Sequence, residues 1–329
     1  MEPPGTGMHF WGRKTAPPLN EWSSDHFAAW PLPSRGRPDI VSAVPETGVI
    51  RRIQCALLDL GVPFFAIGIV FFGFEYLRYG RYEGGLPAVP PWAPAPRVGP
   101  YLVGALLITV GLGIAFDAGR RSSAIVLAAF ILACVVFLHG SRIAAVLADG
   151  RLRTRALEPL AVAASAMALL GIAPSRPEGP AGRAPDDRAA RLGRCLFAFC
   201  MVVFGVQHFL FRRFVSNLVT PWIPAHAFWV VFTGLCFIAA GLAIATGHLG
   251  RAAATWLGIM FLLWFLLEHA PRVAASPGFG PGWDSMFVAL AMSGGSFIVA
   301  RTMPGRGRTP SGSRLRRETK RTDRRVARP

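Results

Sequence analysis

The length, composition and charge of the chain exclude an ordinary soluble domain. Hydrophobic residues make up 52% of its 329 residues, and its mean hydropathy is positive. Soluble proteins of this length are less apolar. Much of the net charge of +17 lies in the C-terminal tail. No folded nucleic-acid-binding motif accompanies that charge, so nucleic acid is not an expected partner.

The chain begins with a polar tail and continues with long apolar segments. Residues 1–50 are rich in proline and tryptophan and lack a helical period, which predicts a disordered cytoplasmic tail. No apolar segment begins near Met1, so we expect no conventional secretory signal. Eight later segments approach the roughly 20 residues that cross a bilayer as a helix. They are 53–77, 99–117, 123–147, 156–173, 194–211, 225–247, 252–270 and 284–300.

Polar stretches divide the apolar part into two domains. Residues 174–191 contain proline, glycine and charges of both signs, which is typical of a linker. It separates a first domain, 51–173, from a second, 192–303. Residues 304–329 form a basic tail that we expect to be disordered and to bind anionic lipid headgroups. Counting loops alternately, 25 of the 35 Lys and Arg lie on the side of the tails, which predicts cytoplasmic termini.

The two domains match each other at a nearly fixed offset. A Pro-Trp-x-Pro motif occurs at Pro91, Trp92 and Pro94 and again at Pro221, Trp222 and Pro224. Further identities at an offset of 130 are Gly104 with Gly234, Ile108 with Ile238, Gly111 with Gly241, Arg121 with Arg251, His139 with His269, and Arg142 with Arg272. A repeat of four helices enters the membrane from the same side in each copy. The sequence therefore predicts an all-α polytopic membrane protein, with about eight transmembrane helices in two parallel four-helix bundle repeats.

Glycines mark the second helix of each copy. Gly104 and Gly111, like Gly234 and Gly241, are seven residues apart and share a helix face. Small residues allow membrane helices to approach closely. We therefore expect these four glycines to serve helix packing.

The second copy resembles a known family. It combines Gly205-Val206-Gln207-His208 at the end of one helix, a Pro-x-x-Pro loop, and the helix marked by Gly234 and Gly241. These features resemble the DoxX-like family of small four-helix membrane proteins. The resemblance covers roughly 192–300 and, more weakly, 60–170, where Glu75-Tyr76 replaces Gln207-His208. It implies a tandem duplication in the bacterial cytoplasmic membrane, and an association with membrane redox systems for some relatives. It carries over no catalytic residue.

Polar side chains are predicted to gather at the outer ends of the helices. The candidates are Glu75, Tyr76, His139, Arg142, Gln207, His208, His226, Glu268, His269 and Arg272. One interpretation is a pocket for a quinone or another amphiphilic ligand. The other is a set of interfacial anchors and interhelical hydrogen bonds. Haem or a metal site is disfavoured, because no closely spaced ligand motif such as H-x-x-x-H occurs.

Three functional hypotheses stay open on the sequence. The first is a scaffold or accessory subunit of a membrane redox system, with a redox protein as partner. The second is a quinone-linked oxidoreductase subunit with its site at the outer rim. The third, a small-molecule transporter, is weakened because few polar residues are expected near the membrane centre. Whether the protein is an enzyme is left open.

Overall fold

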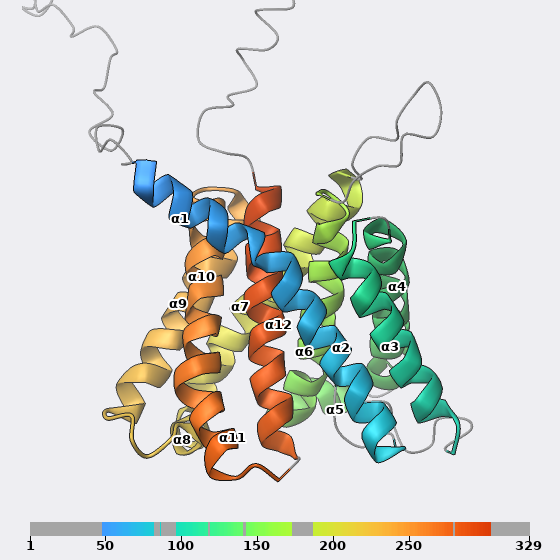
Figure 1. Cartoon of the computed structure of the whole chain (residues 1–329). Coiled ribbons are helices and arrows are strands. Elements are labelled where there is room, and N and C mark those ends of the chain that lie inside the picture. Colours follow the sequence, from blue (N-terminus) through green and yellow to red (C-terminus); the bar gives the residue numbers. More distant parts are fainter. Residues whose placement is uncertain are drawn as a thin grey trace, which may run out of the picture. The chain divides into compact units, whose positions relative to one another are not determined.

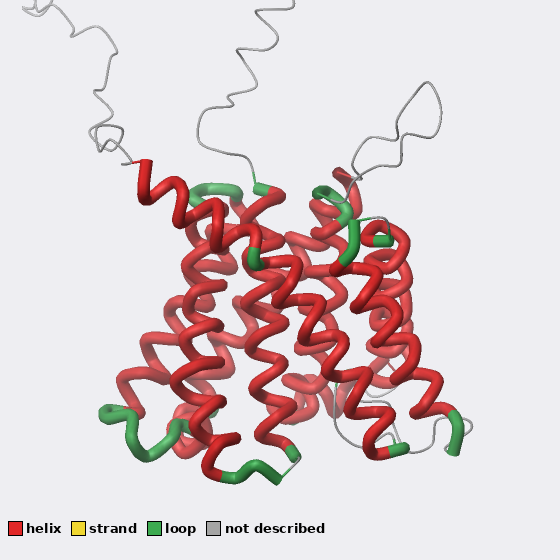
Figure 2. Tube along the Cα trace, viewed as in Figure 1, coloured by secondary structure: helices red, strands yellow, loops and turns green. Residues whose placement is uncertain are grey.

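The computed structural model describes residues 48–81, 86, 97–117, 119–140, 143–172, 187–278 and 280–303. These residues belong to the second of two compact units, which begins at Gly48. Residues 1–47 of the predicted N-terminal tail, the C-terminal tail, most of the linker, the first Pro-Trp-x-Pro motif and Arg142 lie outside the described residues, whereas residues 48–50, predicted as part of that tail, are helical. Within them the chain forms helices and no strand, as Figure 2 shows.

Thirteen consecutive helical elements make up the described part (Figure 1). They are α1 Gly48–Asp59, α2 Gly61–Tyr79, α3 Gly99–Ala115, α4 Arg120–His139, α5 Ile143–Ala148, α6 Gly150–Leu169, α7 Asp187–Leu210, α8 Arg212–Leu218, α9 His226–Thr246, α10 Gly250–Trp264, the π-helical turn Phe265–His269, α11 Ala270–Ala275 and α12 Pro281–Thr302. We call α2, α3, α4 and α6 the N-terminal half, and α7, α9, α10 and α12 the C-terminal half. The short helices α5, α8 and α11 lie at one end of the bundle, the short-helix end, and α1 lies at the other.

Six spans are long and apolar enough to cross a membrane, which supports a multi-pass membrane protein. They are Gln54–Tyr79, Arg120–Phe137, Arg188–Leu210, His226–Thr246, Gly250–Ala275 and Gly282–Thr302. Helix α3 is apolar but has only 17 residues. Helix α6 begins with Arg151, Arg153, Arg155 and Glu158, which lowers its hydropathy. Six of the eight predicted spans are therefore supported, and the predicted count of eight is not confirmed.

Prolines account for two departures from the predicted spans. The segment predicted as 53–77 is divided at Leu60, where α1 ends and α2 begins. Pro63 has no N–H to donate to the preceding turn, which favours a break there. The segment predicted as 252–270 continues to Ala275 through a π-helical turn. Pro271 follows that turn, and its missing N–H removes the α-helical bond that would close it.

The last helix of each half packs on the first helix of the other half. Helix α2 packs mainly on α3 and on α12 of the other half, and α7 packs mainly on α9 and on α6 of the other half. Helices α6 and α12 also contact each other, and both lie in the middle of the bundle in Figure 1. The expected pair of self-contained four-helix bundles is therefore not confirmed. The described helices form one continuous bundle with two seams, the first seam between α2 and α12 and the second between α7 and α6.

Corresponding glycines occupy both seams. A Cβ atom on Gly61 of α2 would lie 3.2 Å from the Gly294 oxygen and 3.1 Å from the Ile298 nitrogen of α12. A Cβ atom on Gly193 of α7 would lie 2.5 Å from the Ala164 oxygen of α6. Backbones approach this closely only where a side chain is missing on one of them. The two seams are thus held by the same kind of backbone contact.

The remaining helix surfaces carry large apolar side chains. Examples that are about half exposed or more are Ile67, Leu102, Val136, Phe137, Phe199, Leu235 and Trp256. In water such a surface would be unfavourable, whereas lipid chains solvate it. In contrast, 67% of the α12 span is buried inside the protein, which agrees with its central position.

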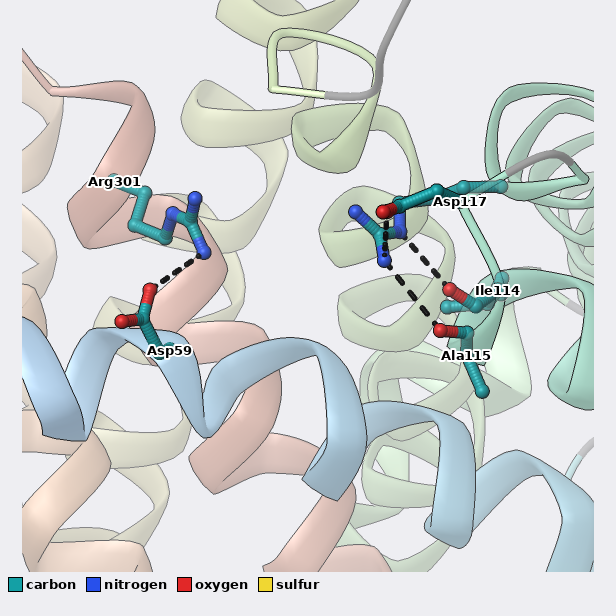
Figure 3. A network of polar contacts seen from close by, with 6 residues as sticks. Asp59, Ile114, Ala115, Asp117 and Arg301 are labelled. Carbon is teal, nitrogen blue, oxygen red and sulfur yellow. Dashed lines mark hydrogen bonds and ion pairs between the residues drawn. The ribbon is translucent and has the colours of Figure 1, made fainter.

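Charged contacts hold the α1 end together (Figure 3). Arg301 at the end of α12 pairs with Asp59 of α1 at 3.2 Å. Arg120 pairs with Asp117 at 2.6 Å, and its Nε atom donates to the Ile114 carbonyl at 3.0 Å. A cation at the C-terminus of α3 satisfies carbonyls that have no helical partner. These contacts lie far along the helices from the predicted cluster of polar residues.

Candidate functional site

The predicted polar residues lie near the short-helix end but form several small groups. Glu75 and Tyr76 lie near the end of α2, and Gln207 and His208 lie near the end of α7. His139 ends α4, and His226 begins α9. Each group has its own set of bonds, and these bonds decide what it can do.

The first group fixes the loop that contains the second Pro-Trp-x-Pro motif. Glu268 is buried, and its Oε2 atom accepts hydrogen bonds from Thr220 N at 3.0 Å and Thr220 Oγ1 at 2.7 Å. Arg272 pairs with Glu268 and also donates to the Leu218 carbonyl. Buried backbone N–H groups require such acceptors. Glu268 and Arg272 therefore act as a clamp on the loop, while Trp222 at its tip is exposed. Thr220 is a partner that the sequence pattern did not indicate.

The histidines are not brought together. His208 Nδ1 lies 2.8 Å from the Phe204 carbonyl of its own helix, to which it donates, and its ring edge contacts Phe237 with 5.2 Å between ring centroids. The buried Nδ1 atom of His269 has no hydrogen-bond partner among the described residues. Burial lowers the pKa of His139, which lies beyond Phe137, the last residue of its span. The half-buried His226 begins a different helix.

The second seam contains a neutral polar pair. Thr154 of α6 donates through Oγ1 to Gln207 Oε1 of α7 at 3.1 Å. Gln207 is 7% exposed, and its Nε2 atom is buried without a partner in the described part of the chain. The pair joins the first helix of the C-terminal half to the last helix of the N-terminal half.

The first seam contains an acidic pair in the corresponding place. The carboxyl group of Glu75 on α2 lies within hydrogen-bonding reach of that of Asp284 on α12. Glu75 is 4% exposed. Glu158 of α6 is a third carboxyl group near Asp284, and Arg155 lies near Glu158. Sequence reasoning missed Asp284, although it lies 130 residues after Thr154, the same offset that relates the two copies.

An aromatic stack lies one helical turn from the acidic pair. The rings of Phe71 and Phe287 stack with centroids 3.6 Å apart, and Trp283 stacks on both at 6.1 and 6.3 Å. Phe71 precedes Glu75 by one turn of α2, and Trp283 directly precedes Asp284 on α12. The stack therefore packs the two helices together beside their carboxyl groups.

In the described residues, the predicted cluster coincides neither with a group of metal ligands nor with the cavity found where α7 meets α8. Within the described residues, His, Cys, Asp and Glu form no group of three or more that is arranged to hold a metal ion. A cavity of about 450 Å³ lies where α7 meets α8 and is lined by the consecutive residues Phe209–Phe214. It thus includes none of the ten predicted site residues.

Comparison with known protein families, with curated proteins and with solved structures gave no match. The resemblance to the DoxX-like family therefore stays a prediction from sequence motifs. Function has to be argued from the bonds and packing described above.

Proposed function

We propose that this chain is a scaffold or accessory subunit of a membrane redox system. In this proposal it is a DoxX-like tandem duplication that crosses the bacterial cytoplasmic membrane eight times. Both tails lie in the cytoplasm, and the basic C-terminal tail contacts anionic lipid. The observation that carries the proposal is that Glu268, Arg272, Gln207 and His208 are bonded to other parts of the same chain.

The duplication is supported by matching contacts in the two halves. A Cβ atom on Gly73 would meet the Gly104 oxygen at 2.7 Å, and one on Gly205 would meet the Gly234 oxygen at 2.6 Å. The two pairs occupy corresponding helices at offsets of 132 and 130 residues. Repeated close contacts of this kind support a common origin of the halves, with α3 and α6 as their shorter and more polar spans.

The exchange of last helices supports a structural role. Because α2 packs on α12 and α7 packs on α6, each half completes its packing with a helix of the other. The exposed apolar surface of such a bundle contacts lipid or a partner subunit. We therefore infer that the exposed surface of the bundle holds a redox protein in place.

The proposal is tested on protein purified from native membranes in mild detergent. We expect a complex with a cofactor-bearing redox protein, and no stoichiometric quinone or visible absorbance from this chain once the partner is removed. A His208→Ala/His269→Ala double variant should lose thermal stability but no absorbance. His248→Ala, at an exposed histidine, is the control. Quinone that copurifies with the isolated chain and is lost only in the double variant would instead support the quinone-linked oxidoreductase. A chain that never copurifies with another protein would contradict the accessory role.

The orientation is tested separately through Cys55. This residue is exposed on α1, and we propose that it faces the cytoplasm. In a variant whose other cysteines are replaced, a membrane-impermeant maleimide should label Cys55 in inside-out vesicles only. Labelling of intact cells would reverse the proposed orientation.

A further inference from the structure

Helices α2 and α12 are closely packed along the first seam. A Cβ atom on Gly68 would lie 2.8 Å from the Ala291 Cβ atom, and one on Gly294 would lie 2.4 Å from the Phe65 nitrogen. Towards the short-helix end this contact continues as the stacked rings of Phe71 and Phe287. The next side chains along the seam are the two carboxyl groups. Their proximity is therefore imposed by packing on both helices.

Glu75 is buried, Asp284 is half-buried, and the pair is incompletely bonded. Glu75 is 4% exposed. Its Oε2 atom and the Oδ1 atom of Asp284 are both buried, and neither has a hydrogen-bond partner in the part of the chain that the structure describes. A buried polar atom without a partner is costly. These two oxygens, which belong to adjacent carboxyl groups, therefore point to a ligand that both of them bind.

The charged surroundings of the pair select the ligand. Tyr79, the last residue of α2, lies close enough to both carboxyl groups to interact with them electrostatically, and Arg78 and Arg81 interact electrostatically with Tyr79. On α6, Glu158 faces Asp284, and Arg155 faces Glu158. Tyr101 is the only titratable residue on α3, and Arg301, the only other charged residue on α12, lies at the far end of that helix.

No described basic side chain forms an ion pair with either carboxyl group. Two adjacent negative charges in an apolar seam require a compensating positive charge. The described residues offer no set of ligands for a metal ion. A proton needs no such set and no cavity, because two carboxyl groups bind it as a donor and an acceptor of one hydrogen bond.

We propose that Glu75 and Asp284 form a proton-binding site, in which the two carboxyl groups hold one proton between them across the seam of the two halves. The site goes beyond the scaffold function, which requires only neutral packing at this place. The second seam is the built-in comparison, because Gln207 and Thr154 make a polar contact there without any ionisable group.

Infrared difference spectroscopy of the protein in lipid tests the proposal. A protonated carboxyl group has a carbonyl stretch that is separate from the bands of a carboxylate and shifts in D₂O. We expect this band at neutral pH in the difference between the wild type and Glu75→Gln, which copies the amide of Gln207. Glu158→Gln serves as the control for other carboxyl groups and should leave the band in place.

The role of Asp284 is tested by following the band as pH rises. We expect it to persist to higher pH in the wild type than in Asp284→Asn, since the variant lacks the neighbouring negative charge. The double variant Gln207→Glu/Thr154→Asp should add a second such band at the second seam. The absence of the band from the wild type minus Glu75→Gln difference would overturn the proposal. Equal pH dependence in Asp284→Asn and the wild type would also overturn it, because the proton would then belong to Glu75 alone. The first criterion compares only the wild type with Glu75→Gln, so it stays in force if Asp284→Asn fails to fold.

Discussion

Replacement of glycine by alanine where α2 crosses α3 and where α7 crosses α9 gives the sharpest test of the packing. In Gly73→Ala the new methyl carbon would lie 2.7 Å from the Gly104 oxygen, and in Gly205→Ala it would lie 2.6 Å from the Gly234 oxygen. Both neighbouring atoms belong to helix backbone and cannot rotate away. The helices must separate to admit the methyl group.

The size of the effect follows from these distances. The methyl carbons would lie about 0.7 Å and about 0.8 Å inside the 3.4 Å at which ordinary contact begins. Relief of this overlap loosens the contact along the whole crossing, and overpacking of this kind costs about 1–3 kcal/mol. We expect about 2 kcal/mol for each substitution, or about a 30-fold change in the unfolding equilibrium constant. Unfolding by sodium dodecyl sulfate in mixed micelles, followed by circular dichroism, measures the change.

Gly140→Ala is the matched control. Gly140 has φ −62° and ψ −44°, which any residue adopts, and a Cβ atom there would meet no atom of the described residues within 4 Å. We expect no loss and a gain of up to about 0.5 kcal/mol, because alanine restricts the unfolded chain. If Gly73→Ala and Gly205→Ala unfold like Gly140→Ala, the close crossings are wrong. If only one of them is destabilised, the two halves do not share the same packing.

The loop clamp, the histidine at the end of α4 and the surface ion pair of α1 give further predictions. Glu268→Ala leaves Thr220 N–H without its acceptor, so we expect a loss of about 3 kcal/mol and faster chymotrypsin cleavage in the loop; unchanged cleavage would show that the clamp is dispensable. Burial lowers the pKa of His139 below its ordinary value of 6.5. Between the folded-state pKa and pH 6.5 the unfolded chain therefore binds more protons than the folded protein, so the protein becomes less stable as pH drops through this interval. In His139→Leu the melting temperature should depend less on pH over that interval, and an unaltered dependence would assign it to another group. Asp59→Asn removes an ion pair whose side chains are 37% and 72% exposed, so we expect a loss below about 1 kcal/mol; a larger loss in thermal unfolding would show that α1 depends on this pair.

The membrane class could be read from sequence because apolar length is a local property. For this reason the predicted span 194–211 ends one residue after α7, and the span 225–247 matches α9 to within one residue at each end. Helix α6 departs from that rule. Its first turns carry Arg151, Arg153 and Glu158, yet Ala161 and Ala164 farther along are fully buried. Other helices of the chain surround it in place of lipid, and hydropathy cannot distinguish these two environments.

The pairing of the helices was beyond what the sequence determines. If two copies are alike, the last helix of one presents nearly the same surface as the last helix of the other. The first helix can therefore pack on either one, as in domain-swapped dimers. The choice depends on the connecting segments and on the crossing of α6 with α12, which involves Ser165 of α6 and Gly295 of α12 at close range. These are properties of the tertiary structure, and a repeat in the sequence does not reveal them.

Because the last helices are exchanged, a sequence difference between the halves changes the contact between the halves and not the interior of one half. In two separate bundles, Glu75 would face its own last helix, and Gln207 would face its own. Across the seams, Glu75 instead meets Asp284, and Gln207 meets Thr154. Each seam therefore combines one residue from each half, and a single substitution in either half changes the chemistry of the contact between them. The backbone contacts of Gly61 and Gly193 are alike, so the two seams differ chiefly in whether they can bind a proton. A duplicated bundle that retains its packing while one seam becomes acidic acquires a chemical asymmetry between its seams near the short-helix end, without any change to the surfaces that contact lipid.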